Sequence, residues 1–167
     1  LWSIQYYSQF QPSERFLYLE TVFDLITDLD PLYFDAYRVG ALIMQIQSRG
    51  DAGEREAAVR RLFDKGIAAM PDDWQLPEVA AWDMALNFND LDAAAHYGEI
   101  AAGRPGAPHR IVRMTGVWKD RTRRFTVEDA VMYWYQALLE AERLADRMLT
   151  LNHLYDAVAR LDRERLQ

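Results

Sequence analysis

The three histidines, His96, His109 and His153, are the residues of this 167-residue chain best suited to hold a metal ion or to move protons near neutral pH. No second histidine lies three or four positions from any of them, and the chain has no cysteine. Asp92, His96 and Glu99 would share one face of a helix and supply three candidate metal ligands. A zinc or two-metal site draws its ligands from several elements, so we expect an ordinary helix surface here and no bound metal.

Nucleophilic catalysis has no recognisable machinery, because the chain lacks cysteine, a Gly-x-Ser-x-Gly sequence and a glycine-rich phosphate loop. Between Gly66 and Gly103 there are Asp and Glu residues but no Lys or Arg. An acid–base pair could be drawn from these carboxylates, although solvated helix faces explain them without catalysis. We therefore expect no catalytic residue and no cofactor.

Positive charge gathers in the segment that follows, from Arg104 to Arg124, where Asp120 is the single acid. One reading is that Arg113, Arg121, Arg123 and Arg124 capture an acidic peptide, a lipid head group or a carboxylate terminus. The other is a solvated turn that offsets the acidic neighbouring segment. Two surfaces of opposite charge could also join chains head to tail, so the sequence leaves open that the chain forms an oligomer.

Overall composition restricts the class of protein. With 50% hydrophobic and 13% aromatic residues, the chain is that of an ordered globular protein. The net charge of −7 argues against nucleic acid as a partner, because such binding needs a surplus of Lys and Arg. No apolar run is long enough for a membrane helix, and the absence of cysteine excludes disulfides.

Apolar residues recur at helical spacing along most of the chain, and no segment alternates as a strand does, so the sequence predicts an all-α fold. Ser13 and Thr126 are the expected N-caps of two of the helices. The sequence leaves open whether the last helix is interrupted near Thr150 to Asn152. The predicted helices cover residues 14–28, 32–47, 54–69, 74–88, 91–103, 108–118, a stretch from 126, and 141–165, with a loop at 48–53 and a basic turn at 119–124.

Prolines divide the chain at intervals of about 34 to 40 residues, and small residues recur where paired helices would cross. This pattern resembles the tetratricopeptide repeat family, although Val59 and Ile100 stand at positions that the family gives to small residues, and the third unit has no closing proline. The matching residues are Gly40, Phe63, Gly66 and Pro71 in the first unit, Ala81, Ala93, Tyr97 and Pro105 in the second, and Gly116, Ala130, Trp134 and Ala137 in the third.

The resemblance implies an α-α superhelix of about three helix pairs with flanking N- and C-terminal helices, in a single domain over residues 1–167. Its units would cover about 31–71, 72–107 and 108–141. Residues 142–167 would form capping helices that shield the apolar edge of the stack. The charged outer face expected of this cap includes Arg143, Asp146, Arg147, Arg160, Asp162, Arg163 and Glu164.

In arrays of this family the first helix of each unit lines a concave groove, and Trp, Tyr and Arg are common at binding hot spots. The alternative for the tryptophans, including Trp74 and Trp134, is packing between helices. The resemblance and the basic segment together give these candidate partner-binding residues: Tyr33, Tyr37, Met44, Glu78, Trp82, His109, Arg110, Arg113, Trp118, Arg121, Arg123 and Arg124.

The aromatic opening Trp2 to Tyr7, together with Leu29-Asp30-Pro31 and the segment Pro71 to Trp74, resembles a set of bacterial envelope repeat proteins. In those proteins a membrane anchor precedes the aromatic opening. The resemblance implies an anchor upstream of Leu1 and a periplasm-facing location, with the cytoplasm as the alternative.

The leading functional expectation is a non-enzymatic protein-interaction module, a scaffold that holds a partner protein or peptide in its groove. The competing class is a permanent structural subunit of a larger, membrane-attached bacterial assembly, which predicts apolar patches around Trp2, Tyr6, Tyr7 and Phe10. A third class is an enzyme that uses the acidic segment, which predicts converging carboxylates with raised pKa values.

Overall fold

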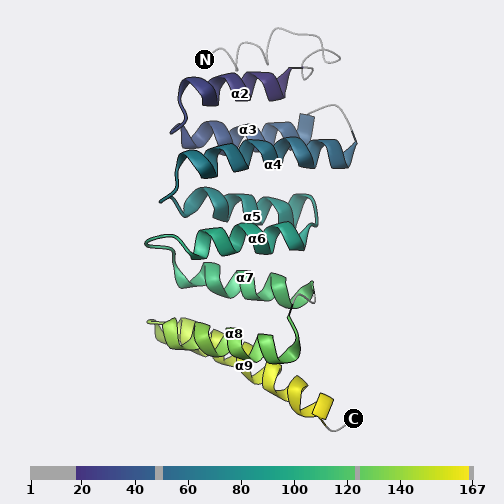
Figure 1. Cartoon of the computed structure of the whole chain (residues 1–167), viewed down its shortest axis with the longest axis vertical. Coiled ribbons are helices and arrows are strands. Elements are labelled where there is room, and N and C mark those ends of the chain that lie inside the picture. The colour runs from purple at the N-terminus through teal and green to yellow at the C-terminus, as the bar shows by residue number, and fades with distance from the viewer. Residues whose placement is uncertain (1–17, 48–50, 123–124, 166–167) are drawn as a thin grey trace. The chain divides into compact units, whose positions relative to one another are not determined.

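The computed structural model describes residues 18–47, 51–122 and 125–165, and in these ranges it is built from α-helices without a strand (Figure 1). The predicted all-α class is confirmed. Several expectations lie outside the described residues: the N-cap Ser13, the aromatic opening Trp2 to Tyr7, the apolar patch that includes Phe10, and Arg123 and Arg124. The helices are α2 (Leu19–Leu29), α3 (Phe34–Gln47), α4 (Ala52–Ala69), α5 (Gln75–Asn87), α6 (Leu91–Ala102), α7 (His109–Arg121), α8 (Val127–Glu140) and α9 (Leu144–Arg165).

Side-chain caps fix where several helices begin. Thr126 accepts a hydrogen bond from the backbone N–H of Asp129 at 3.1 Å, and the Asp129 carboxylate accepts one from the backbone N–H of Thr126, so the predicted N-cap of α8 is confirmed. Asp51 and Glu54 form the same reciprocal pair at the start of α4. This cap starts α4 at Ala52, two residues before the predicted position.

Two helices are longer or more regular than the sequence suggested. α7 continues through Lys119 to Arg121, although these residues were expected in a turn. Basic side chains in the last turn of a helix interact favourably with its negative end, which explains the extension. α9 runs without a break through Thr150, whose side chain is fully buried.

The chain divides into two compact units, the first up to Ala80 and the second from Ala81, and the division falls inside α5. In the first unit α2, α3 and α4 pack on one another. A Cβ added at Gly40 of α3 would come within 2.9 Å of both Phe23 on α2 and Leu62 on α4. Gly66 of α4 lies as tightly against Tyr37 of α3. The glycines therefore allow the close helix approach that the sequence predicted.

In the second unit, α6 packs along α7, and α8 and α9 form an antiparallel pair (Figure 1). Gly116 of α7 lies against Tyr133 and Trp134 of α8, with no room for a Cβ. Trp134 is 1% exposed and centres a cluster with Ala130, Ala137 and Ala157. Small residues again stand where helices approach one another, and large aromatic side chains fill the space between them.

His153 of α9 stacks on the Trp134 ring, with ring centroids 4.4 Å apart. Burial lowers the pKa of His153 and Arg113 adds to this effect, while Asp156 and Asp120 oppose it. In the unfolded chain the pKa of a histidine is about 6.5, so the unfolded chain binds the proton more tightly than the folded one. The stability contributed by neutral His153 is therefore complete above about pH 6.5 and declines as the pH falls through the lowered folded-state pKa.

We expect the melting temperature of the His153→Gln variant to fall less than that of the wild type between about pH 7.5 and about pH 5.5. Equal pH dependence in the two proteins would refute this prediction.

None of the helices in the described ranges is both long enough and apolar enough to span a bilayer.

Candidate functional site

A pocket of about 720 Å³ opens in the second unit where four segments converge. The end of α6 and the loop after it contribute Ala102 and the stretch from Gly106 to Pro108. Glu140 ends α8, and Asp146 lies in the first turn of α9. Gly106 has a φ of 74°, a backbone conformation that residues with a Cβ rarely adopt, and this turn brings the chain back into α7.

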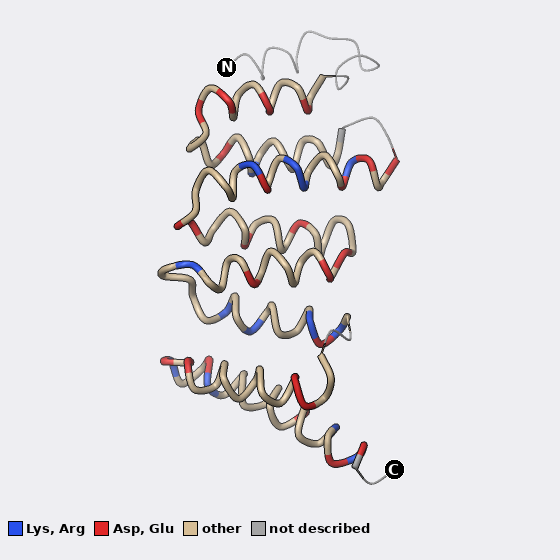
Figure 2. The backbone as a smooth tube through the Cα atoms, viewed as in Figure 1, with Lys and Arg blue, Asp and Glu red and all other residues tan. Residues whose placement is uncertain are grey.

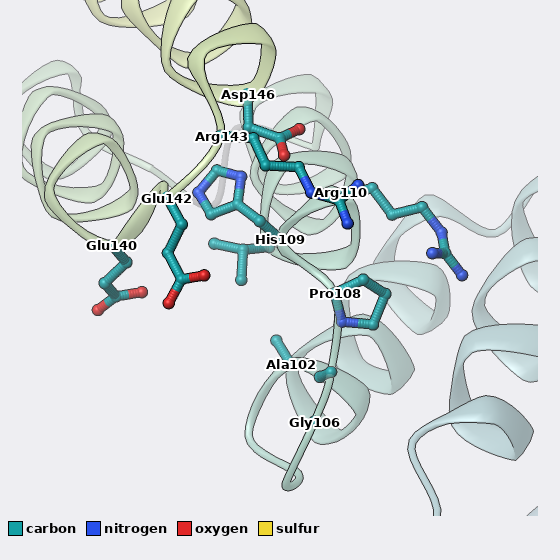
Figure 3. Close-up of a pocket in the computed structure, with 11 residues that line it drawn as sticks. Ala102, Gly106, Pro108, His109, Arg110, Glu140, Glu142, Arg143 and Asp146 are labelled. Carbon is teal, nitrogen blue, oxygen red and sulfur yellow. The ribbon is translucent and has the colours of Figure 1, made fainter.

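Charges of both signs line this pocket. Figure 3 shows Glu140 and Glu142 on one side of His109, and Arg110 and Arg143 on the other. Asp146 forms an ion pair of 2.8 Å with Arg113, which ties the start of α9 to α7. Asp146 lies beside Arg143 in Figure 3, so one side of the pocket is acidic and the other carries both signs, a lining that can bind polar and charged groups of a polypeptide.

His109 is held in place by the backbone of α8. Its Nε2 lies 2.7 Å from the carbonyl oxygen of Ala137, and because that oxygen can only accept, Nε2 carries the hydrogen. The other ring nitrogen, Nδ1, is buried and has no hydrogen-bond partner. His109 therefore packs the start of α7 against α8, and its ring forms part of the pocket wall.

The basic segment is largely used within the fold. Lys119 of α7 binds Glu99 of α6 at 2.5 Å, and Asp120 binds Arg160 of α9 through two hydrogen bonds. Figure 2 shows the acidic α6 beside the largely basic α7. The Lys119–Glu99 pair favours the hypothesis that the basic segment offsets its acidic neighbour. Arg121 is exposed at the end of α7.

Of the candidate partner-binding residues in the first unit, Tyr37 and Met44 lie in the interior. The hydroxyl of Tyr37 donates a hydrogen bond to the carbonyl of Pro31, and burial raises its pKa. Core packing therefore accounts for Tyr37 and Met44. Tyr33 is exposed just before α3, and Glu78 is half-buried on α5.

In the second unit the structure brings two of the candidate tryptophans together. The edge of one ring points at the face of the other, with centroids 5.2 Å apart, and Trp118 is buried while Trp82 is 36% exposed. Trp118 is thus a packing residue, and Trp82 presents part of its ring to solvent. His109 and Arg110 lie at the pocket, and Arg113 is held by its ion pair.

The candidate metal ligands on α6 do not form a centre. Glu99 is held by Lys119, and Asp92 and His96 are exposed. Throughout the described ranges, no group of three His, Asp or Glu residues is arranged to hold a metal ion.

The outward faces of α8 and α9 carry apolar side chains beside charged ones. Of the residues expected on a charged outer face of the C-terminal cap, Arg143, Arg147, Asp162, Arg163 and Glu164 are exposed. Asp146 and Arg160, which were placed on that face, instead turn toward α7 and form ion pairs there. On α8 the exposed residues Met132, Tyr135 and Leu139 form what we call the α8 stripe. On α9 the exposed residues Leu144, Met148, Leu151, Tyr155 and Val158 form what we call the α9 stripe.

Both stripes follow helical periodicity. Residues of the α9 stripe are spaced by four, three, four and three, which places them along one line of the helix, and those of the α8 stripe by three and four. Between Asp129 and Glu140 the tube of α8 carries no charge in Figure 2. These surfaces were not predicted from the sequence, although their helical spacing was a readable signal.

Comparison with models of known protein families found no matching family, and searches of curated proteins and of solved structures found no significant match.

Proposed function

We propose that this chain is a non-enzymatic protein-interaction module with tetratricopeptide-like helix pairs, which binds a partner polypeptide. The observation that carries the proposal is the pair of exposed apolar stripes on α8 and α9. Soluble monomeric proteins rarely leave contiguous apolar patches larger than a few hundred Å² in water, and larger patches commonly mark interaction sites.

The position of the stripes supports a binding role over a packing defect. α8 and α9 are held firmly from the inside by Trp134, Ala137 and Ala157, so their outward side chains are not needed for the core of the unit. A rigid scaffold that presents apolar side chains loses little conformational entropy when a partner binds. The charged pocket at the junction of α8 and α9 would add polar contacts that orient the partner.

Site-specific photo-crosslinking in cells tests this proposal. A photoreactive amino acid in place of Leu151 should give a discrete adduct with a polypeptide, because Leu151 lies in the middle of the α9 stripe. The matched control replaces Ala68, an exposed residue of α4. Adducts that are equally strong at both positions, or absent from both, would contradict a binding role for the stripe.

The second candidate function, a permanent subunit of a larger assembly, is favoured by exposed apolar residues in the first unit. Leu25 and Leu29 on α2 share one face, and Val39, Leu42 and Ile46 on α3 follow one line. A chain with an apolar face on each unit could contact more than one neighbour. This function predicts that the native protein, gently extracted, elutes in a high-mass complex that survives dilution, whereas a chain that elutes alone would exclude it.

A further inference from the structure

The α9 stripe has the geometry of one side of a helix–helix seam. Spacings that alternate between four and three residues are the a and d positions of a heptad repeat, and a side chain at such a position packs between the side chains of a second helix. Leu144 and Tyr155 are about three-quarters exposed, so the stripe lacks a partner helix in the described part of the chain. Leu151 and Val158 complete the line.

One edge of the stripe is lined by small residues at a spacing of seven. Ala145, Asn152 and Ala159 follow one another at this interval beside the apolar line. Small side chains at the edge of a seam allow a second helix to approach closely. No charged residue interrupts α9 between Arg147 and Asp156. The surface is therefore shaped to receive a helix.

We propose that the occupant is a second copy of this chain, whose α9 pairs antiparallel with the first about a two-fold axis near residue 153. In this register Met148 faces Val158 of the other copy, and Leu151 faces Tyr155 of the other copy. Each of these facing pairs joins two members of the α9 stripe. The edge formed by Ala145, Asn152 and Ala159 is also self-complementary. Ala145 meets Ala159 of the other copy, and Asn152 meets Asn152 of the other copy. A two-fold axis produces such reciprocal contacts from one surface.

Charge selects the antiparallel direction. Asp162 follows the stripe on the same line of the helix, with Arg163 and Glu164 on its other faces, whereas Arg143 and Arg147 lie near the start of the stripe. An antiparallel pair places the Asp162 carboxylate of each copy beside the arginines of the other. A parallel pair would place like charges together at both ends, and it would also align the two helix dipoles.

The buried area is close to what a specific contact needs. The five side chains of the stripe each expose on the order of 100 Å², so complete pairing of two stripes would hide at most roughly 1,000 Å² in total, which is near the lower limit for a specific interface. α9 has 22 residues and α8 has 14, and Figure 1 shows the C-terminal part of α9 extending past α8. The second copy can therefore reach the stripe along its length.

Sedimentation analysis of the purified chain, from about 1 µM to about 1 mM, tests the pairing because it covers weak and moderate dimer affinities. The wild type should approach twice the monomer mass of 19.4 kDa as the concentration rises. Leu151→Glu and Tyr155→Glu should each raise the concentration at which half of the chains are dimeric by at least tenfold. Leu149→Glu, on the same helix but off the stripe, should dimerise as the wild type does. A wild type that stays monomeric throughout, or stripe variants that dimerise normally, would overturn the proposal.

Disulfide trapping tests the direction of pairing, because the chain has no native cysteine. Asn152→Cys should form a disulfide-linked dimer under mild oxidation, since residue 152 meets its own counterpart. Ala145→Cys should not, because its counterpart lies at the far end of the antiparallel pair. The reverse pattern would overturn the antiparallel register.

This inference rests on the proposed function, and the two can fail separately. A monomeric wild type whose residue 151 crosslinks to a different polypeptide overturns self-pairing while the interaction function stands. A monomer that forms no adduct at residue 151 contradicts both.

Discussion

Trp134→Ala is expected to destabilise the chain by about 3 to 5 kcal/mol and to lower its melting temperature by about 6 to 20 °C, the usual range for deleting a buried aromatic side chain from a domain of this size. Trp134 is 1% exposed and fills the space between α7, α8 and α9. Its ring packs edge-on against Tyr133 and stacks on His153. Removing it leaves a cavity that the surrounding alanines cannot fill.

Two matched variants separate packing from other causes. Trp134→Phe should cost much less, because it keeps an aromatic ring and removes an indole N–H that is buried without a hydrogen-bond partner. Trp82→Ala should also cost less, since Trp82 already exposes part of its ring. Thermal unfolding followed by circular dichroism measures all three. A Trp134→Ala melting temperature within about a degree of the wild type would show that Trp134 does not hold the unit together.

Gly116→Leu should lower the melting temperature by about 2 to 12 °C, because overfilling a packed interior costs about 1 to 3 kcal/mol. A Cβ at Gly116 would lie 2.5 Å from Tyr133 and 2.7 Å from Trp134, so α7 and α8 would have to separate. The hydroxyl of Tyr133 donates to the carbonyl of Val112 at 2.6 Å, and this bond limits how far the ring can move.

The control for this variant is Gly103→Ala. Gly103 has a φ of −77°, and an added Cβ would have no atom closer than 3.5 Å. The melting temperature of this control should remain equal or rise slightly, because alanine restricts the unfolded chain. If Gly116→Leu were as stable as Gly103→Ala, the helices would not cross at Gly116.

Local signals in the sequence predicted the helices well. Pro31 and Pro71 follow the ends of α2 and α4 because proline cannot continue a helix, and Thr126 with Asp129 marks the start of α8. The close approach at Gly40 was also foreseen, since glycine is the residue that permits it. The helix ends and the cap depend on residues that are near one another in the chain, and the close approach depends on the glycine itself.

The pocket was harder to foresee because its lining comes from four segments. His109 and Arg110 were candidates, but Glu140 and Arg143 lie more than twenty residues away in the sequence. Only the packing of α8 on α7 brings them together, and no local pattern reports that packing. Tyr37 and Met44 were misplaced for a related reason, since an apolar residue on a first helix can face either the groove or the core.

The outer face of α9 was foreseen only in part, because a list of charged residues does not show which of them turn inward. Asp146 and Arg160 are charged, yet they point toward α7, where Arg113 and Asp120 neutralise them. The residues left outside are those of the α9 stripe together with charged residues such as Arg147 and Asp156. A helical projection of residues 144–158 shows the stripe, but the inward direction becomes known only when the helix is docked.

The most direct test of the binding account is the accessibility of residue 151 in the cell. Leu151→Cys provides a single thiol in a chain without cysteine, and Ala68→Cys on α4 serves as the exposed control. In cells, a maleimide should label the Ala68→Cys variant quickly and the Leu151→Cys variant slowly. Dilution of the purified proteins should remove this difference in labelling rate. Equal and rapid labelling at both positions in cells would contradict the binding account, because the α9 stripe would then be uncovered where the protein works.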